Sequence, residues 1–351
     1  MAFEVIDLKM LDEFVESNSG LGMPLSSLQR KTVEDLTEAF LNGSIKTVAR
    51  EKCLCGSTDR KTLSKRDRFG LPFGTALCGR CDLIYQTRML SADSVSLFYQ
   101  QYYWPLINGD REHSTTLSRD LSMLKTAFNN VLTSSKSTLV VLEIGCGRGE
   151  LLAQTRELGS VVRDQIVLQL KGFDYSSEAV DRAKAFDLDV DVGGLKEALD
   201  SGIKADLLIL SHVVEHIPDV ETFLTQARRL MTQDGLVYVE VPGVLSLMEQ
   251  RAYGQSYQAF CVLAHCYNFC LSSLKSVMVR SGYQMVSGNE KVESVWRLNE
   301  SRSMVSTKEA NTQILSYLLD CQQQRKMKEK STLYLVKRFV KYLLRYKNFA
   351  G

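Results

Sequence analysis

The 351-residue sequence predicts an α/β fold with a doubly wound, seven-stranded sheet, preceded by a small cysteine-rich module and helical segments and followed by a C-terminal helix. Three observations predict it. Apolar, β-branched runs alternate with helical segments between residues 136 and 300. The first run enters a glycine-rich loop, and two cysteine pairs lie upstream. We expect an N-terminal helical extension over 1–48, the cysteine-rich module over 49–90, a helical and aromatic segment over 91–135, the main domain over 136–300 and a basic helical tail over 301–351.

Composition narrows the class of protein. With 44% hydrophobic and 24% charged residues the chain has the make-up of a soluble globular protein, and a net charge of +2 makes nucleic acid an unlikely partner. No apolar run reaches the roughly 20 residues that span a bilayer, and the acidic, interrupted N-terminus does not resemble a signal peptide, so we expect a cytoplasmic protein. Nine cysteines, an odd number, favour reduced thiols, some of them metal ligands, over a disulfide framework.

The N-terminal part combines helices with two cysteine pairs. Residues 1–48 read as two short amphipathic helices around a turn at Ser19–Gly22. Beyond them, two turn-like knuckles supply the pairs Cys53/Cys55 and Cys78/Cys81. Four thiolates of this kind can close a tetrahedral zinc site, which would stabilise a segment too small to form its own core. The alternative is an unmetallated pair of turns.

Aromatic residues mark the next segment. Phe98–Pro105 is an aromatic cluster, and a helix is expected over about Thr115–Leu132. Aromatic residues at this density more often form buried packing than ligand contacts.

The glycine-rich loop is the centre of the main domain. The strand Leu139–Ile144 passes through Glu143 into Gly145, Gly147 and Gly149, and a helix begins at Glu150. Glycine is needed where backbone turns sharply and a ligand lies against bare peptide. The spacing does not fit a dinucleotide fingerprint, and no Lys-Ser/Thr pair follows as in a phosphate loop. An ordinary strand-turn-helix is the alternative.

The remaining elements follow in alternation. A second strand over Val167–Phe173 ends at Asp174, after an expected insertion at Val161–Ile166. The later expected elements are a helix over Ser176–Ala185, a strand over Leu188–Val192 with a turn at Gly193–Leu195, a strand over Asp206–Ser211, a helix over Phe223–Met231, a strand over Leu236–Val241, a helix that opens at Leu271, and strands over Tyr283–Val286 and Val292–Arg297.

The segment from Glu143 to Gly149 resembles the E-x-G-x-G-x-G motif of class I S-adenosylmethionine-dependent methyltransferases, whose fold is Rossmann-like. The resemblance implies that the glycines hold the methionine part of the cofactor and that Asp174 accepts the ribose hydroxyls. The residues expected to contact S-adenosylmethionine are Tyr103, Glu143, Gly145, Cys146, Gly147, Gly149, Asp174, Tyr175, Gly194, Leu195, Ser211 and His212.

The run from Arg68 to Gln86 resembles the zinc-ribbon module that precedes this domain in methyltransferases of polysaccharide and deoxysugar pathways. That resemblance implies a structural zinc ion on Cys53, Cys55, Cys78 and Cys81. Two positions depart from the pattern. Lys52 stands where the first cysteine is usual, and Asp82 replaces a glycine after the last one. Tyr103 becomes a candidate lid residue over the cofactor.

Two later motifs carry the chemistry in the same subgroup. His212–Pro218 resembles S-H-V-L-E-H-I/L and is not a zincin H-E-x-x-H helix, so His212 is read as a crevice residue and Glu215 with His216 as capping or packing groups. His265–Phe269 resembles a segment whose histidine faces the substrate, although Ala264 replaces the usual glutamate. A core histidine is the alternative. His265 is the predicted general base, because imidazole titrates near neutral pH, and Tyr267 is a second catalytic candidate.

These motifs predict a methyltransferase that acts on a small-molecule or glycan acceptor, such as a sugar nucleotide or lipid-linked glycan, at a sugar hydroxyl or carbon. The tail from Arg325 to Lys347 carries nine basic residues and one acidic residue, and Leu333, Val336, Val340 and Leu343 recur in it at helical spacing. It can lie on an anionic membrane surface as a peripheral contact or pack against the domain. The alternatives are a nucleic-acid-binding methyltransferase, which a steep salt dependence would reveal, and a non-catalytic scaffold with the same fold.

Overall fold

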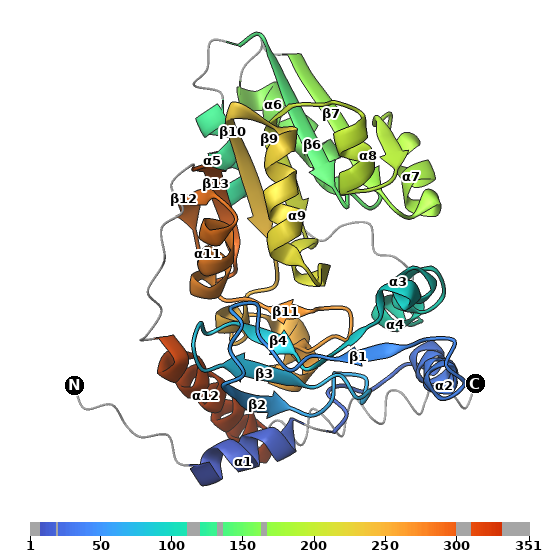
Figure 1. Cartoon of the computed structure of the whole chain (residues 1–351), viewed down its shortest axis with the longest axis vertical. Helices are drawn as coiled ribbons and strands as arrows, with labels where there is room; N and C mark the ends of the chain where they lie inside the picture. The colour runs from blue at the N-terminus through green and yellow to red at the C-terminus, as the bar shows by residue number, and fades with distance from the viewer. Residues whose placement is uncertain are drawn as a thin grey trace, which may run out of the picture.

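The computed structural model describes residues 8–18, 20–110, 120–131, 136–162, 167–299 and 310–331. Figure 1 shows an upper body built on a large sheet and a lower body built on a smaller one. Within the described ranges no helix is long and apolar enough to cross a membrane.

A seven-stranded sheet forms the upper body and confirms the predicted fold class. Its order is β12-β13-β10-β9-β6-β7-β8. The strands from β8 to β10 are parallel, whereas β13 is antiparallel to both of its neighbours. The bounds are β6 (Thr138–Ile144), β7 (Val167–Asp174), β8 (Val190–Val192), β9 (Ala205–Ser211), β10 (Met231–Glu240), β12 (Tyr283–Gly288) and β13 (Glu293–Leu298).

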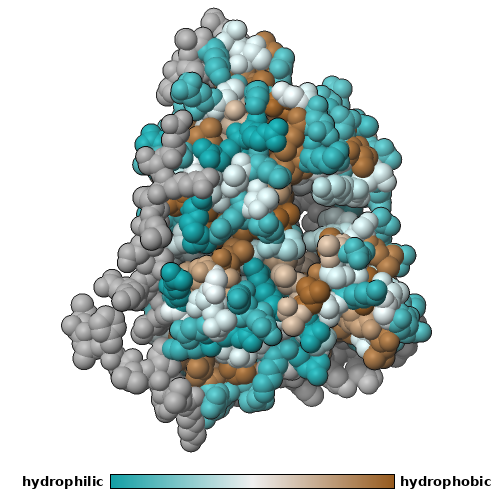
Figure 2. All heavy atoms as spheres, in the orientation of Figure 1, coloured by the Kyte–Doolittle hydropathy of each residue, from teal (hydrophilic) through white to brown (hydrophobic). Residues whose placement is uncertain are grey.

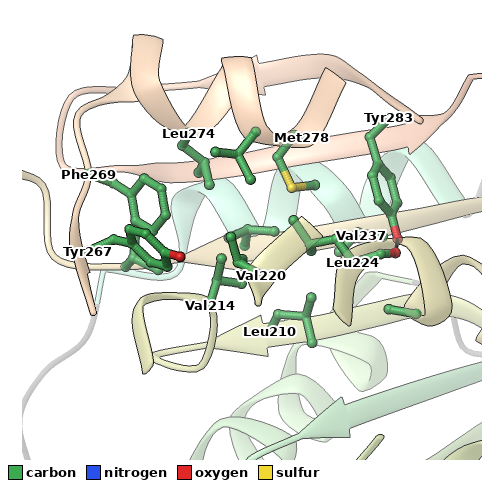
Figure 3. Packing of buried hydrophobic residues seen from close by; sticks show 14 of the residues in the cluster. Leu210, Val214, Val220, Leu224, Val237, Tyr267, Phe269, Leu274, Met278 and Tyr283 are labelled. Carbon is green, nitrogen blue, oxygen red and sulfur yellow. Dashed lines mark hydrogen bonds between the residues drawn. The ribbon is translucent and has the colours of Figure 1, made fainter. Parts of the chain in front are cut away.

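Helices cover both faces of this sheet because its strands are apolar on both sides. One face packs against α5 (Ser122–Val131), α6 (Glu150–Val162) and α7 (Ser177–Lys184). The other packs against α8 (Leu195–Asp200), α9 (Val220–Ala227) and α11 (Leu271–Arg280). Figure 3 shows the second face, where Leu210 and Val237 of the sheet meet Leu224 of α9 and Leu274 of α11.

A four-stranded antiparallel sheet of order β11-β4-β3-β2 forms the lower body. Its strands are β2 (Arg60–Ser64), β3 (Thr75–Cys78), β4 (Ile84–Gln86) and β11 (Tyr267–Asn268). Beside it, β1 (Thr47–Ala49) pairs with β5 (Arg88–Leu90). The strand β11 comes from the late part of the chain, almost two hundred residues after β4. One hydrophobic cluster contains Cys53, Cys78 and Cys81 together with Leu210 and Val214, so the two bodies share a core.

The remaining helices surround the lower body. They are α1 (Leu8–Ser17), α2 (Ser27–Leu41), α3 (Ala92–Phe98), the π-helix η1 (Tyr99–Tyr103), α4 (Trp104–Asn108), α10 (Tyr257–Phe260) and α12 (Ala310–Lys330), with 3-10 turns η2 (Val214–His216), η3 (Arg228–Leu230), η4 (Val244–Ser246) and η5 (Arg251–Tyr253). Ser26 begins α2 through a capping box with Gln29. Figure 2 shows a mainly hydrophilic face on which hydrophobic residues form small groups.

Several expected boundaries are wrong. The aromatic cluster is itself helical, because α3, η1 and α4 run continuously through it. The helix expected to end at Met231 ends at Ala227, and β10 begins at Met231 with an irregular register before Leu236. Of the expected insertion, residues 163–166 lie outside the described residues, as do residues 332–347 of the basic tail. The two N-terminal helices are present as predicted.

Candidate functional site

The glycine loop follows β6 and adopts a left-handed backbone at each glycine. The φ angles are +73° at Gly145, +54° at Gly147 and +77° at Gly149. An added Cβ would lie 2.6 Å from the Val213 side chain at Gly145 and 2.4 Å from Leu188 at Gly149. At Gly147 it would meet nothing within 4 Å. Two glycines therefore permit close packing, and Gly147 borders open space where a ligand can lie against the backbone.

Asp174 holds this loop from the end of β7. One carboxylate oxygen, Oδ2, accepts the Gly147 N–H at 2.8 Å, and the other, Oδ1, accepts the Ser176 N–H at 2.8 Å. The same residue's carbonyl accepts the Gly193 N–H at 2.9 Å. Asp174 thus joins the glycine loop, the start of α7 and the loop before α8 at one edge of the sheet.

The other predicted cofactor residues lie around this edge. Glu143 and Cys146 are buried, and Gly194 with Leu195 begins α8. The Tyr175 ring lies over Gly194, where an added Cβ would be 2.3 Å from its hydroxyl oxygen. Burial, and then the charges of Glu143 and Asp174, raises the pKa of the Cys146 thiol. Negative potential at the loop suits a positively charged ligand group.

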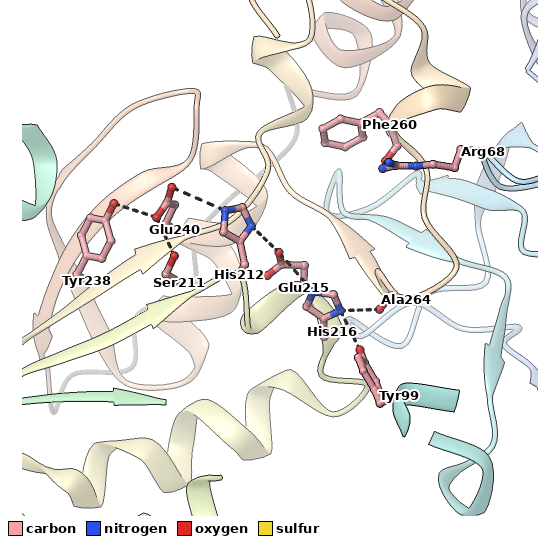
Figure 4. Close-up of polar contacts among 10 residues, drawn as sticks. All are labelled: Arg68, Tyr99, Ser211, His212, Glu215, His216, Tyr238, Glu240, Phe260 and Ala264. Carbon is pink, nitrogen blue, oxygen red and sulfur yellow. Dashed lines mark hydrogen bonds and ion pairs between the residues drawn. The ribbon is translucent and has the colours of Figure 1, made fainter. Parts of the chain in front are cut away.

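The end of β9 carries a second polar group. His212 has a left-handed φ of +55°, and its N–H donates to the Glu240 carbonyl at 2.8 Å. Its Nδ1 lies 3.3 Å from Glu215 Oε1, and its Nε2 lies 3.8 Å from Glu240 Oε1. Ser211 Oγ donates to Glu240 Oε2 at 2.8 Å. Figure 4 shows this chain of contacts running from Glu240 through His212 to Glu215.

His216 and His265 extend the group toward the lower body. His216 Nδ1 lies 3.1 Å from the Ala264 carbonyl oxygen and 3.0 Å from the Tyr99 hydroxyl (Figure 4). The His216 and His265 rings meet edge to face, with centroids 4.8 Å apart. The Tyr103 and His216 ring centroids lie 6.1 Å apart. Burial, and to a smaller extent the charge of Glu215, raises the pKa of the Tyr103 hydroxyl.

Burial keeps both imidazoles neutral. It lowers the pKa of His265 well below 6.5, and the charges of His216, Arg68 and His212 lower it further. Burial also lowers the pKa of His216, against the opposing effect of Glu215. Sequence reasoning placed the His265 titration near neutral pH, and the structure lowers that expectation because desolvation disfavours the charged imidazole, although the residue is partly exposed.

Tyr267 lies apart from these residues. It belongs to β11, its hydroxyl accepts a hydrogen bond from Arg50 Nη2 at 2.6 Å, and it donates to the Pro218 carbonyl. The Arg50 guanidinium also lies 4.7 Å from the Tyr267 ring centroid. The Tyr267 hydroxyl thus links Arg50 of the lower body to Pro218 of the upper body.

The four predicted cysteine ligands form a compact cluster. Cys53 Sγ lies 3.5 Å from Cys81 Sγ, Cys55 Sγ lies 3.5 Å from Cys78 Sγ, and all four sulfur atoms lie within 4.8 Å of one another. Zn–S bonds of about 2.3 Å put sulfur atoms about 3.8 Å apart in a tetrahedron, so the donor set fits zinc. Gly56 and Asp82 are left-handed, with φ of +80° and +59°, and the short Cys-x-Cys gap still reaches the cluster.

Sequence reasoning missed one acidic residue, Glu240, and gave another, Glu215, a purely structural role. Glu240 ends β10 and accepts from Ser211, and its signal was an acidic residue at the carboxyl end of a parallel strand. Glu215 was expected to cap or pack, but it lies between His212 and His216.

Comparisons with known proteins find similarity to methyltransferases. A family model described as a methyltransferase domain matches residues 117–288. This part of the chain is therefore similar to a methyltransferase domain. Over 107 residues the chain is 34% identical to a ubiquinone biosynthesis O-methyltransferase of Rhizobium leguminosarum bv. trifolii, an alignment that covers 29% of this chain and 39% of that protein. A protein of the same description from Brucella ovis is 30% identical over 104 residues, which is 28% of this chain and 39% of the relative.

The chain therefore spans about two-fifths of the length of these relatives. Solved structures similar to the methyltransferase domain include a SAM-dependent methyltransferase from Archaeoglobus fulgidus, with 22% identity, a TM-score of 0.35 and coverage of 47% of this chain and 70% of that one. A plantazolicin methyltransferase in complex with SAH has 16% identity, a TM-score of 0.39 and coverage of 58% and 78%.

Proposed function

We propose that this protein transfers a methyl group from S-adenosylmethionine to a small-molecule acceptor, at a hydroxyl oxygen or an acidic carbon. The observation that carries the proposal is the pairing of two features at one sheet edge. The open loop at Gly147, held by Asp174, adjoins the polar group formed by His212, Glu215 and His216. One side suits a nucleoside-bearing donor and the other can receive an acceptor.

The loop residues suit this donor. Gly147 leaves space against the backbone, and Asp174 presents a carboxylate to ribose hydroxyls from the end of β7. The bound donor supplies an electrophilic sulfonium methyl group. Buried Glu143 and partly exposed Asp174 give the loop a negative potential that complements this positive charge. Tyr103 can close over the donor from η1.

The acceptor side is assigned to His265, which we propose as the general base. Neutral imidazole can remove the proton from the acceptor as its oxygen or carbon attacks the methyl group, the C–S bond breaks and S-adenosylhomocysteine forms. The His265 ring is partly exposed and packs edge to face on His216, which in turn contacts the Tyr103 ring. A sugar-nucleotide or glycan acceptor is a further part of the proposal, supported by the resemblance of the cysteine module and of His265–Phe269 to sugar methyltransferases.

The cysteine cluster is proposed to hold one structural zinc ion on Cys53, Cys55, Cys78 and Cys81. The observed spacing of the four sulfur atoms supports this assignment. A cytoplasmic location is consistent with nine cysteines that form no disulfide.

Calorimetric titration with S-adenosylhomocysteine, followed by mass spectrometry of candidate acceptors incubated with the methyl donor, tests the function. We expect binding in the micromolar range and a raised melting temperature, because the ligand binds only the folded state. His265→Ala should lower turnover by roughly a hundredfold with little change in donor affinity, whereas His212→Ala should affect both. Tight NAD binding without any response to S-adenosylhomocysteine would overturn the proposal.

A further inference from the structure

Glu215, His216 and His265 meet at one point beside the glycine loop. One donor atom from each lies within 4.8 Å of the others. They come from separate segments, since Glu215 and His216 lie in η2 after β9 and His265 immediately precedes the segment of β11. We propose that these three side chains bind a divalent transition-metal ion, distinct from the ion of the cysteine cluster.

The tautomer of His216 is the first support. A carbonyl oxygen can only accept, so the contact of 3.1 Å with Ala264 places the imidazole proton on Nδ1. Nε2 therefore carries a lone pair, and this atom lies 3.8 Å from Glu215 Oε1. A backbone carbonyl that fixes one ring nitrogen while the other is left to coordinate is the usual arrangement around metal-binding histidines.

The burial of Glu215 is the second support. Its side chain is 1% exposed, and its Oε2 atom has no hydrogen-bond partner among the described residues. A buried carboxylate is costly unless it is paired or coordinates a metal. The contact of 3.3 Å with His212 Nδ1 involves only Oε1. Oε2 is therefore available as an anionic ligand.

His265 completes the set. Its backbone N–H is bonded to the Val262 carbonyl at 2.9 Å, while its ring nitrogens form no hydrogen bond in the part of the chain that the structure describes. The ring lies edge to face with His216, which brings the two imidazoles to the same point.

Two imidazoles and one carboxylate favour iron, cobalt, manganese or zinc in the divalent state, and they leave coordination positions open. The role of the ion rests on the proposed function. An acceptor hydroxyl bound at an open position would lose its proton more readily, as metal-bound water does, and a solvent water molecule would take up that proton. In that case His265 serves the reaction as a ligand of the ion, which replaces its role as the base.

The test uses the full chain with its cysteine-bound metal in place. Protein treated with EDTA is desalted and reloaded with one equivalent of Zn²⁺ for the cysteine cluster, and it is then titrated with Co²⁺ by calorimetry while the visible absorption of the ion is recorded. We expect one additional Co²⁺ per chain with the weak bands of nitrogen and oxygen ligation. Glu215→Gln, which keeps the shape of the side chain, should weaken binding by more than about a hundredfold, and Glu215→Asp should restore part of it. Cys270→Ser, outside both clusters, is the control and should bind as the parent does.

Two results would overturn the inference: no Co²⁺ binding beyond the cysteine site, or equal binding by Glu215→Gln with an unchanged melting curve. S-adenosylhomocysteine binding is measured on the same EDTA-treated samples. Its absence would refute the proposed function, whereas its retention without Co²⁺ binding would refute only the metal site.

Discussion

Gly147 and Gly202 have similar backbones and different surroundings. Both are left-handed, with φ of +54° and +72°, and neither has an atom within 4 Å of an added Cβ. Gly147 lies in the loop held by Asp174, whereas Gly202 lies in the turn after α8. If a substitution at Gly147 has an effect that the same substitution at Gly202 lacks, that effect therefore reports on the space beside the glycine loop.

Gly147→Ala should lower the affinity for S-adenosylhomocysteine by at least about tenfold, because the methyl group enters the space of the ligand. Gly202→Ala should introduce the same kind of backbone strain, which lowers the free energy of unfolding by about 1–2 kcal/mol in both variants. It should leave the affinity for S-adenosylhomocysteine unchanged. Calorimetric titration and thermal melting of both variants separate the two effects. Equal affinity losses would mean that strain alone disturbs the loop.

Asp67 is a buried carboxyl that links the lower body to the segment before His265. It accepts the N–H groups of Phe69, Leu71 and Leu263 at 3.0, 2.9 and 3.2 Å. Burial raises its pKa to about 7, although these donors lower it. The folded state therefore holds a proton between pH 4 and 7 that the unfolded state, with a pKa of about 3.9, releases.

The stability contributed by Asp67 should fall as pH rises from 4 to 7, by up to about 4 kcal/mol, and stay constant above pH 7. Urea unfolding of the parent and of Asp67→Asn, which cannot titrate, isolates the effect as a difference between the two curves. A difference that is independent of pH would show that the three N–H donors keep this carboxyl ionised.

At the scale of elements, the cysteine knuckles and β11 form one unit. Tyr267 pairs with Tyr85 of β4, and both share the cluster that holds Cys53, Cys78 and Cys81. Substitutions in the two cysteine knuckles should therefore also disturb the segment that carries His265.

Replacing Cys78 and Cys81 by serine should release about one zinc ion per chain and lower the melting temperature, while part of the S-adenosylhomocysteine affinity remains. Cys270→Ser is the control, because that thiol already contacts the Ser272 and Ser273 hydroxyl groups at 3.2 and 3.4 Å. Metal analysis and melting curves are the measurements. Parent-like stability without metal would leave the cysteines as ordinary buried thiols.

Local patterns predicted most of the large sheet. The runs from Leu139 and Val167 are apolar and end at glycine or acidic residues, so β6 and β7 were found almost to the residue. The alternation of hydrophobic and polar residues did not reveal that Phe98–Pro105 is helical, because the rings of this segment pack on several neighbours at once. The strand β11 has two residues and exists only through its partner β4, a long-range contact that no local pattern reveals.

The candidate site was predicted unevenly for the same reason. Asp174 and the glycines belong to a contiguous motif and an expected strand end, which sequence can reveal. Glu215 and His216 were recognised as residues, yet their meeting with His265 depends on the return of the chain from β10 to β11. Burial, which sets the charge state of His265, is also a property of the folded molecule.

At the scale of the whole molecule, Arg50 holds Tyr267, whose hydroxyl donates to the Pro218 carbonyl of the upper body. It stems from the loop after β1, donates to the Tyr267 hydroxyl at 2.6 Å and lies 4.7 Å from that ring. The Tyr85 ring centroid lies 5.4 Å from the same guanidinium group. The cation thus binds both the cysteine-rich sheet and the segment that follows His265.

Arg50→Ala should lower the free energy of unfolding by about 1–3 kcal/mol through the lost charged hydrogen bond and cation–π contacts. It should raise the KM for the acceptor and leave the affinity for S-adenosylhomocysteine unchanged, because the donor loop lies on other strands. Arg88→Ala, which removes an exposed contact of 2.9 Å to Thr47, is the control. Unfolding curves measure the change in stability, and kinetics measure the change in KM. A change in donor affinity alone would contradict this account.

The strand β11 has a consequence for how such a chain can change over generations. A module joined only by linkers can be lost or exchanged as a cassette, with the neighbouring domain left intact. Here the lower sheet takes one strand from the later half of the chain, immediately after His265. Deleting residues 49–90 would leave Tyr267 and Asn268 without their pairing strand. We therefore expect the cysteine-rich part and the domain of the large sheet to be inherited together, because removal of the first would leave β11 of the second unpaired.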